Sequence, residues 1–127
     1  MTTSTTNKET CPANFKTISR PWCDQIIYDT AGNFQVKRIT VKAGMRSSYQ
    51  THARRNEYWV VVTGLCRFVL DGIEHVCGPG ETANAHAGVK HRFGSANAEP
   101  MTLIEIQSGD YFGEDDIVRY EDDFGRV

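Results

Sequence analysis

Apolar and polar residues alternate along several short stretches of the chain, which glycine, proline or asparagine separate. The strongest stretches, rich in β-branched and aromatic residues, are 34–42, 57–63 and 101–107. Weaker candidates of the same kind are 25–29, 46–54, 82–85 and 89–93. No amphipathic helix of any length is evident. Many short strands with turn residues between them predict an all-β sandwich or barrel.

One hairpin can be placed by its turn. Asp71-Gly72 lies between two strand-like runs, and this dipeptide favours a two-residue β-turn. Counting outward from the turn pairs Cys66 with Cys77, with Cα atoms about 5.5 Å apart. That spacing permits a disulfide, but the N-terminus carries no apolar secretion signal. We therefore expect two reduced, buried thiols.

Size and charge narrow the classes of function. The 127 residues suit one domain, which we place at 20–127 behind a flexible N-terminal arm at 1–19. The formal net charge is −2, whereas nucleic-acid-binding proteins are typically strongly basic, so nucleic-acid binding is not expected. No apolar run approaches the roughly 20 residues that cross a bilayer. We expect a cytoplasmic protein without nucleic-acid or membrane partners.

Histidines, a carboxylate and an amide suggest a metal site. Gln50 and His52 are two residues apart, so they share a face of an extended strand. Glu57 is out of phase with them, and only a turn or bulge between the two stretches would return it to that face. His91 comes from a later stretch. Nitrogen and oxygen donors of this kind bind catalytic divalent metals.

The spacing of these residues resembles the two motifs of the cupin family. The matching positions are Gly44, His52, Glu57 and Gly64 in the first motif, and Gly80, Gly88, His91 and Asn97 in the second. The resemblance implies a double-stranded β-helix, that is, a jelly-roll barrel. It also implies that a metal is held inside the barrel by the histidine and glutamate side chains.

A closer resemblance is to the type II mannose-6-phosphate isomerases. The matching runs are Arg20-Pro21-Trp22, 36–42 (VKRITVK), Gln50-x-His52, Arg55-x-Glu57-x-Trp59 with 60–62 (VVV), 87–92 (AGVKHR), 107–109 (QSG) and 113–119 (GEDDIVR), with Glu121-Asp122 and Gly125-Arg126 after them. They extend from Arg20 to Arg126. The resemblance implies interconversion of mannose 6-phosphate and fructose 6-phosphate. Family members often carry a nucleotidyltransferase domain first, and nothing before Arg20 could supply one, so we expect no pyrophosphorylase activity of this chain.

The chain departs from the family pattern at the metal motif. Arg54 stands where the family has the second histidine of His-x-His, and an arginine cannot ligate a metal. Elsewhere, His86 replaces a proline and Cys23 a glycine. Two outcomes stay open. Either the remaining ligands suffice, or the site has lost its metal and Arg54 pairs with Glu57 or a phosphate.

The resemblance and the residue types together give a set of roles. The predicted metal ligands are Gln50, His52, Glu57 and His91. The candidate catalytic residues are Arg55, Lys90 and Glu105, where Glu105 is either a base facing inward or a paired structural carboxylate. The predicted phosphate-binding residues are Arg46, Arg54 and Arg92.

The cofactor expected is a divalent metal, with zinc favoured and iron, manganese, nickel or cobalt as alternatives. The ligand expected is a small sugar phosphate, and we expect a homodimer because pairing of edge strands covers their open ladders. Two other functions stay open at this stage. One is a cupin that binds a sugar phosphate without turnover, and the other is a metal-dependent oxygenase, because two histidines and a carboxylate can hold iron(II).

Overall fold

A computed structural model describes residues 15–127, which form eleven β-strands. In chain order they are β1 (Lys16–Arg20), β2 (Cys23–Thr30), β3 (Phe34–Val41), β4 (Tyr49–Thr51), β5 (Arg55–Thr63), β6 (Cys66–Leu70), β7 (Ile73–Cys77), β8 (Thr82–Ala85), β9 (His91–Ser95), β10 (Met101–Gly109) and β11 (Val118–Glu121). Among the described residues, no helix is long and apolar enough to cross a membrane.

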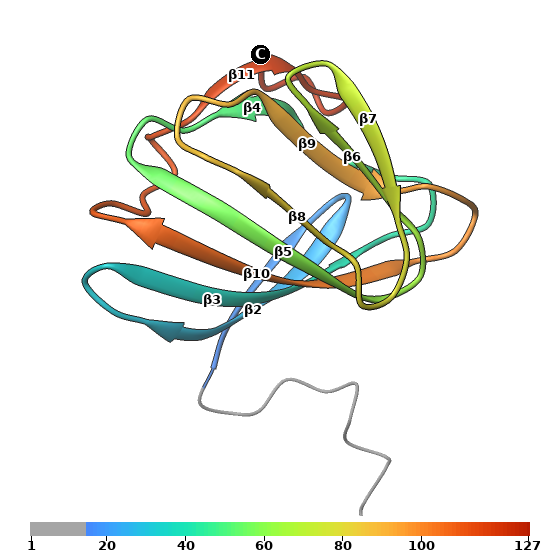
Figure 1. Ribbon diagram of the computed structural model, residues 1–127, viewed down its shortest axis with the longest axis horizontal. Helices are drawn as coiled ribbons and strands as arrows, with labels where there is room; N and C mark the ends of the chain where they lie inside the picture. The colour runs from blue at the N-terminus through green and yellow to red at the C-terminus, as the bar shows by residue number, and fades with distance from the viewer. Residues whose placement is uncertain (1–14) are drawn as a thin grey trace, which may run out of the picture.

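The strands form two antiparallel sheets that face each other (Figure 1). The six-stranded sheet has the order β1-β2-β3-β10-β5-β8, and the five-stranded sheet has the order β11-β4-β9-β6-β7. From β3 onward the chain alternates between the two sheets, except at the β6–β7 hairpin, as in a double-stranded β-helix. The predicted all-β cupin barrel is therefore confirmed.

Most of the predicted strands lie where the alternation indicated. The stretches 34–42, 57–63 and 101–107 fall within β3, β5 and β10 to within two residues at each end. The stretch 46–54 is strand only at Tyr49–Thr51, with an isolated β-bridge from Arg46 to Gly94 before it and a bend at Ala53 and Arg54 after it. The chain thus leaves β4 before it reaches His52.

The hairpin between β6 and β7 has the predicted register. Cys66 is paired with Cys77, and Leu70 with Ile73 at the turn. Asp71 and Gly72 both have positive φ, at 47° and 82°, as this turn requires. Both cysteines are free thiols, and burial raises the pKa of Cys66 to about 12.

The boundary of the N-terminal arm needs correction. Residues 16–19 belong to β1, which pairs along its whole length with β2, from Lys16 opposite Ile27 to Arg20 opposite Cys23. This pairing was missed because β1 is short and its alternation is weak. Of the remainder of the predicted arm, Phe15 directly precedes β1, and residues 1–14 lie outside the described residues.

The inner face of the six-stranded sheet changes character along the barrel. Cross-strand rows run through β3, β10 and β5, and one end is apolar, with Ile39, Leu103 and Val61 side by side. The next rows toward the other end are polar and buried. They comprise Lys37, Glu105 and Trp59, and then Gln35, Gln107 and Glu57. Buried polar groups cost free energy unless they are paired, so this end is built for a ligand or for internal hydrogen bonds.

Candidate metal centre

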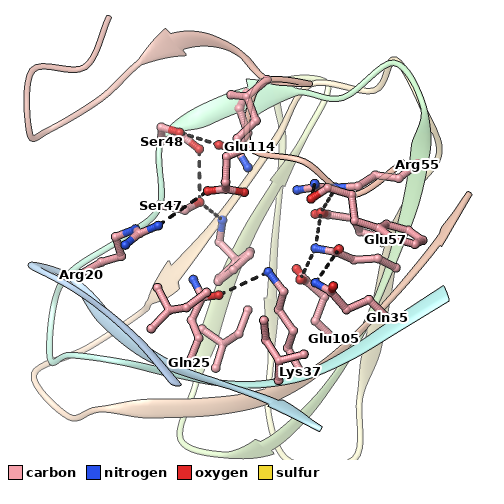
Figure 2. Close-up of a pocket in the computed structure, with 18 of the residues that line it drawn as sticks. Arg20, Gln25, Gln35, Lys37, Ser47, Ser48, Arg55, Glu57, Glu105 and Glu114 are labelled. Carbon is pink, nitrogen blue, oxygen red and sulfur yellow. Dashed lines mark hydrogen bonds and ion pairs between the residues drawn. The ribbon is translucent and has the colours of Figure 1, made fainter. Parts of the chain in front are cut away.

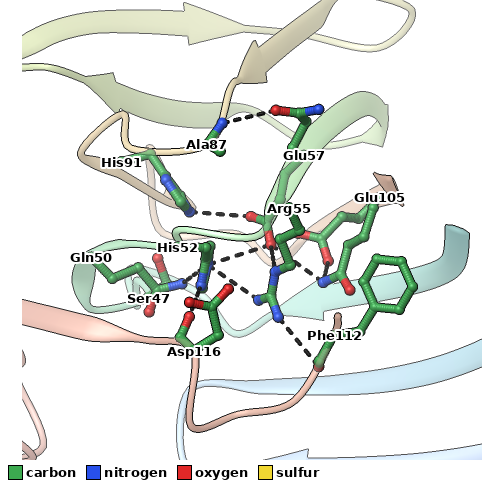
Figure 3. A network of polar contacts seen from close by, with 12 residues as sticks. Ser47, Gln50, His52, Arg55, Glu57, Ala87, His91, Glu105, Phe112 and Asp116 are labelled. Carbon is green, nitrogen blue, oxygen red and sulfur yellow. Dashed lines mark hydrogen bonds and ion pairs between the residues drawn. The ribbon is translucent and has the colours of Figure 1, made fainter. Parts of the chain in front are cut away.

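Two histidines and a glutamate meet at the polar end of the barrel (Figure 3). His52 follows β4, Glu57 lies on β5, and His91 opens β9. Each residue is 2% exposed, and one ligand atom from each lies within 4.8 Å of the others. The structure therefore brings three of the four predicted metal ligands together.

The Nε2 atom of His91 faces Glu57 and receives no hydrogen bond from residues 15–127. Its Nδ1 donates to the Val89 carbonyl at 3.0 Å, which leaves a lone pair on Nε2 when the ring is neutral. Nε2 lies 3.1 Å from Glu57 Oε1 and, within residues 15–127, makes no hydrogen bond. Burial lowers the pKa of His91, but the Glu57 carboxylate outweighs it, so the net pKa is raised. Only a proton or a cation between the two groups relieves this contact.

His52 is held as a neutral imidazole. Its Nδ1 donates to the Asp116 carbonyl at 2.8 Å, so its Nε2 carries the lone pair and lies 3.5 Å from Glu57 Oε2. That lone pair accepts from Arg55 Nη2 at 3.1 Å and from Gln50 Nε2 at 3.2 Å. Burial lowers the pKa of His52, consistent with these donors.

The donor set fits a divalent cation. Two imidazole Nε2 atoms and a carboxylate are ligands that zinc and iron(II) take in catalytic sites. Both rings are fixed by backbone carbonyls, the outer hydrogen bonds that orient metal-binding histidines. Burial raises the pKa of Glu57, but His91, Arg55 and His52 outweigh it, so the net pKa is lowered and the group is a carboxylate. Arg55, which donates from Nε to Glu57 Oε2 at 2.9 Å, competes with a metal for the same groups.

Gln50, the fourth predicted ligand, presents its amide N–H to His52. Its Oε1 accepts from Ser48 Oγ at 2.6 Å, so a ligand role requires the side-chain amide to rotate by half a turn.

Arg55 is 5% exposed and also donates to the Phe112 carbonyl at 3.3 Å. It therefore lies inside the site.

A cavity of about 320 Å³ lies beside this centre, between the two sheets. Figure 2 shows Arg20 with Glu114 on one side of it and Arg55 with Glu57 on the other. Polar residues of the six-stranded sheet complete much of its wall, namely Gln25, Gln35, Lys37, Glu105 and Gln107. The volume and its convergent polar groups suit a small polar metabolite.

Glu105 faces this cavity from β10. Its Oε1 accepts from Trp59 Nε1 and its Oε2 from Gln107 Nε2, both at 2.8 Å. Burial, followed by the nearby charge of Glu57, raises the pKa of Glu105. Glu105 therefore faces inward, as the base alternative requires, and is hydrogen-bonded on both oxygens, as the paired-carboxylate alternative requires, so both alternatives stay open.

Two of the predicted phosphate contacts lie outside the cavity. Arg54 is exposed, where it donates to Asp110 at 3.1 Å and packs over the ring of Tyr111 at 4.7 Å. Arg46 is also exposed, and its guanidinium binds both carboxylate oxygens of Asp123, at 2.8 and 3.0 Å. Both arginines fasten the C-terminal segment to the barrel instead of facing the site.

Arg92 and Lys90, the other two predicted cationic residues, also lie outside the cavity wall. Arg92 is buried, but it donates to the Ser47 carbonyl at 3.1 Å and to Glu121 at 3.2 Å, away from the cavity wall. The ammonium of Lys90, predicted as catalytic, packs over the ring of Tyr120 at 4.4 Å. Thus none of Arg46, Arg54, Lys90 and Arg92 lines the cavity.

The cavity has its own cations, which the sequence analysis did not select. Arg20, Arg119 and Arg126, here called the basic mouth, line both the cavity and an adjoining surface pocket. In the part of the chain that the structure describes, Trp22 Nε1 and Arg119 Nε are buried there without a hydrogen-bond partner. Lys37 lies deeper and donates to Gln25. Lys37, Arg119 and Arg126 fall in runs shared with the isomerase family, which was the available signal.

The fold and the cluster of two histidines and a glutamate define the protein as a cupin. Residues 7–122 match the family model described as "Mannose-6-phosphate isomerase C-terminal", so the chain belongs to that family. It is 42% identical over 110 residues to mannose-1-phosphate guanylyltransferase ManC of Salmonella typhimurium and 40% identical over 110 residues to alginate biosynthesis protein AlgA of Pseudomonas aeruginosa.

Each alignment covers 87% of this chain and 23% of the relative, so the chain spans about a quarter of the length of these proteins. Among solved structures, it resembles an uncharacterized conserved protein with a double-stranded β-helix domain from Klebsiella pneumoniae. The TM-score is 0.70 at 17% identity, over 82% of this chain and 89% of the other. At that identity the likeness supports the fold alone.

Proposed function

We propose that this protein is a metal-dependent isomerase that interconverts mannose 6-phosphate and fructose 6-phosphate. The observation that carries the proposal is the meeting of His52, Glu57 and His91 beside a cavity with a basic mouth. Family membership supports the reaction class. The sugar would lie with its carbonyl end toward the histidines and its phosphate toward the mouth.

The metal would be held by His52, Glu57 and His91, and zinc is the proposed ion, with iron, manganese, nickel or cobalt as alternatives. When bound, it supplies Lewis-acid polarisation of the substrate oxygens at C1 and C2. Arg55 is placed to donate to the same oxygens once it releases His52, since its guanidinium reaches the ligand atoms.

Glu105 is the proposed base. Isomerisation removes a proton from C2 of mannose 6-phosphate to give an enediol and returns a proton to C1 of that enediol. A base works best when its pKa is near the working pH, and burial raises the pKa of Glu105 in that direction. Trp59 and Gln107 fix its two oxygens, which would limit the entropy lost in reaching the reacting carbons.

The basic mouth is the proposed phosphate site. Within residues 15–127, the buried Nε of Arg119 and the indole N–H of Trp22 have no hydrogen-bond partner. Arginines bind phosphate oxygens with two parallel donors, which gives both affinity and orientation. Arg20 and Arg126 keep carboxylate partners in the free protein, Glu114 at 3.8 Å and Asp122 at 2.7 Å. A dianionic phosphate would compete for these pairs.

The direct test is an assay for mannose 6-phosphate formation from fructose 6-phosphate by protein reconstituted with each divalent metal. Turnover that disappears in Glu57→Gln and persists in Glu74→Gln, a surface acid paired with Arg67, is the expected result. Metal-loaded wild-type protein without isomerisation would contradict the proposal. Oxygen uptake in its place would favour the oxygenase reading.

One observation favours a second candidate, a cupin that binds a sugar phosphate without turning it over. Arg55 already pairs with Glu57 and occupies the lone pair of His52, so a proton on His91 Nε2 would be enough to complete the pairing without a metal. In that case the metal-free protein would bind fructose 6-phosphate in calorimetry, and added metal would change neither affinity nor product formation.

We further propose that the protein acts in the cytoplasm as a homodimer. The outer face of the six-stranded sheet exposes apolar side chains, with Val60 at 40%, Val62 at 46% and Ile106 at 41%. Pairing of such faces or of edge strands would cover them. Light scattering on the purified protein would give about twice the 14.3 kDa chain mass if this is correct.

A further inference from the structure

Asp116 contacts the link between β4 and β5 in two different ways. It lies between β10 and β11, more than 60 residues away in the sequence. Its main-chain carbonyl accepts from His52 Nδ1 at 2.8 Å (Figure 3). Its carboxylate accepts from the backbone N–H groups of Ala53 and Arg54, at 3.1 and 2.9 Å. One residue therefore binds three consecutive positions of the link.

The link needs such a partner because it lies outside the sheet. Residues 52–54 follow the last residue of β4 and precede β5, so they belong to neither strand. A carboxylate that accepts two backbone N–H groups makes strong charge-assisted hydrogen bonds. These bonds hold the peptide in place, and the carbonyl of the same residue then meets the ring of His52.

The contact with Asp116 affects the protonation of the His52 ring as well as its position. With Nδ1–H given to a carbonyl, the lone pair of His52 must be on Nε2, the nitrogen that faces Glu57. We propose that Asp116 is a positioning residue that sets the tautomer and ring orientation of His52 for a divalent cation. This inference rests on the metal site of the proposed function. Asp116 acts through His52 and does not touch the cation.

The neighbouring Asp115 provides a matched control. Its carboxylate accepts from the hydroxyl of Tyr111, a contact within the same segment. Asp115 is exposed, and within residues 15–127 the side chain that accepts from the link is that of Asp116. Asp115→Ala therefore removes the same charge one residue away and leaves intact the hydrogen bonds that residues 52–54 make to Asp116.

The first experiment uses the metal-free protein. Long-range ¹H–¹⁵N spectra of the imidazoles at pH 8, with His52 assigned by its loss in His52→Gln, report the tautomer directly. Wild type and Asp115→Ala should show His52 protonated on Nδ1. Asp116→Ala should show a mixture with the Nε2-protonated form. An unchanged Nδ1-protonated ring in Asp116→Ala would overturn the inference.

The second experiment measures affinity for Zn²⁺ by competition with a chromophoric chelator. Loss of an outer hydrogen bond to a ligand costs about 10–100-fold, which is the expected effect of Asp116→Ala. Asp116→Asn keeps an acceptor for one N–H and should recover part of that loss, and it serves as the test variant if the alanine variant does not fold. Equal affinity in wild type, Asp116→Ala and Asp116→Asn would overturn the inference. Wild-type protein that binds no Zn²⁺ would contradict the proposed metal site, and the spectra would still decide whether Asp116 sets the tautomer.

Discussion

His91 Nε2 and Glu57 Oε1 lie 3.1 Å apart in a site where each residue is only 2% exposed. With Nδ1 of His91 already donating to a carbonyl, both facing atoms are acceptors whenever the ring is neutral. The metal-free protein can satisfy the pair only by placing a proton on Nε2. A bound cation would take the place of that proton.

This relationship predicts that metal binding releases a proton. Because Glu57 raises the pKa of His91, the ring is protonated below that pKa and neutral above it. Binding should release about one proton below this pKa and none well above it, and affinity should fall about tenfold per pH unit below it. Calorimetry in buffers of different ionisation enthalpy measures the release.

The pKa of His52 is lowered, so His52 becomes protonated at lower pH than His91. The proton release from His91 can therefore be measured separately. His91→Gln is the control, since it removes the titrating ring. Zn²⁺ affinity that does not vary between about pH 5 and 8, the range in which histidine titrates, would rule out this exchange of proton for metal.

Glu57 is expected to be the most sensitive position of the centre. Glu57→Gln removes a charged ligand and leaves Arg55 without its buried carboxylate partner. Outer-shell losses alone weaken metal sites about 10–100-fold, so loss of a ligand should exceed about 100-fold. Competition titration with a chelator measures this change. A Glu57→Gln protein with near wild-type affinity would show that the ion binds elsewhere.

Arg119 is expected to govern affinity for the phosphate. A hydrogen bond to a charged group contributes about 1.5–3 kcal/mol, so Arg119→Gln should raise KM for fructose 6-phosphate roughly 10–100-fold with a smaller change in kcat. Arg67→Gln, which alters a surface pair with Glu74, should leave KM unchanged. A loss of kcat at constant KM would instead place Arg119 in the chemical step.

Trp59 links the core to the proposed base. Trp59→Phe keeps an aromatic ring against Phe68 but removes the N–H that Glu105 Oε1 accepts at 2.8 Å. We expect a loss of about 1–3 kcal/mol in the free energy of unfolding, measured with urea. Because that donor lowers the pKa of Glu105, its loss should move the pH–rate profile to higher pH.

The control for this variant is Tyr58→Phe, on the outward face of the same strand, which should change neither quantity. A pH–rate profile that stays fixed in Trp59→Phe would argue that Glu105 is a structural carboxylate only.

Local patterns were enough to predict much of the fold. The turn at Asp71-Gly72 sets the β6–β7 register by itself, and that register is confirmed. In β3, an inward Lys37 could be read from its two-residue spacing to Ile39 and Val41, which are buried core residues. Such signals are local, because a strand repeats every two residues.

The directions in which the side chains of Arg54 and Arg92 point could not be predicted from the local sequence pattern. Arg54 leaves the metal face because the chain ends β4 at Thr51 and restarts at Arg55, so the two-residue period does not cross the link. Arg92 is buried on the outer side of its sheet because the C-terminal segment, through Glu121, packs over it. Both placements depend on contacts between residues distant in sequence, and the roles of Arg119 and Arg126 in the cavity wall depend on the same segment.

The most direct measurement is the divalent metal content of the chain after purification without chelating resin, compared with His91→Ala and Glu57→Gln. We predict close to one ion per chain in the wild type, most of it lost in both variants. Wild-type protein that stays empty when supplied with Zn²⁺, Fe²⁺, Mn²⁺, Ni²⁺ or Co²⁺, or variants that keep the full content, would contradict a metal centre formed by His52, Glu57 and His91.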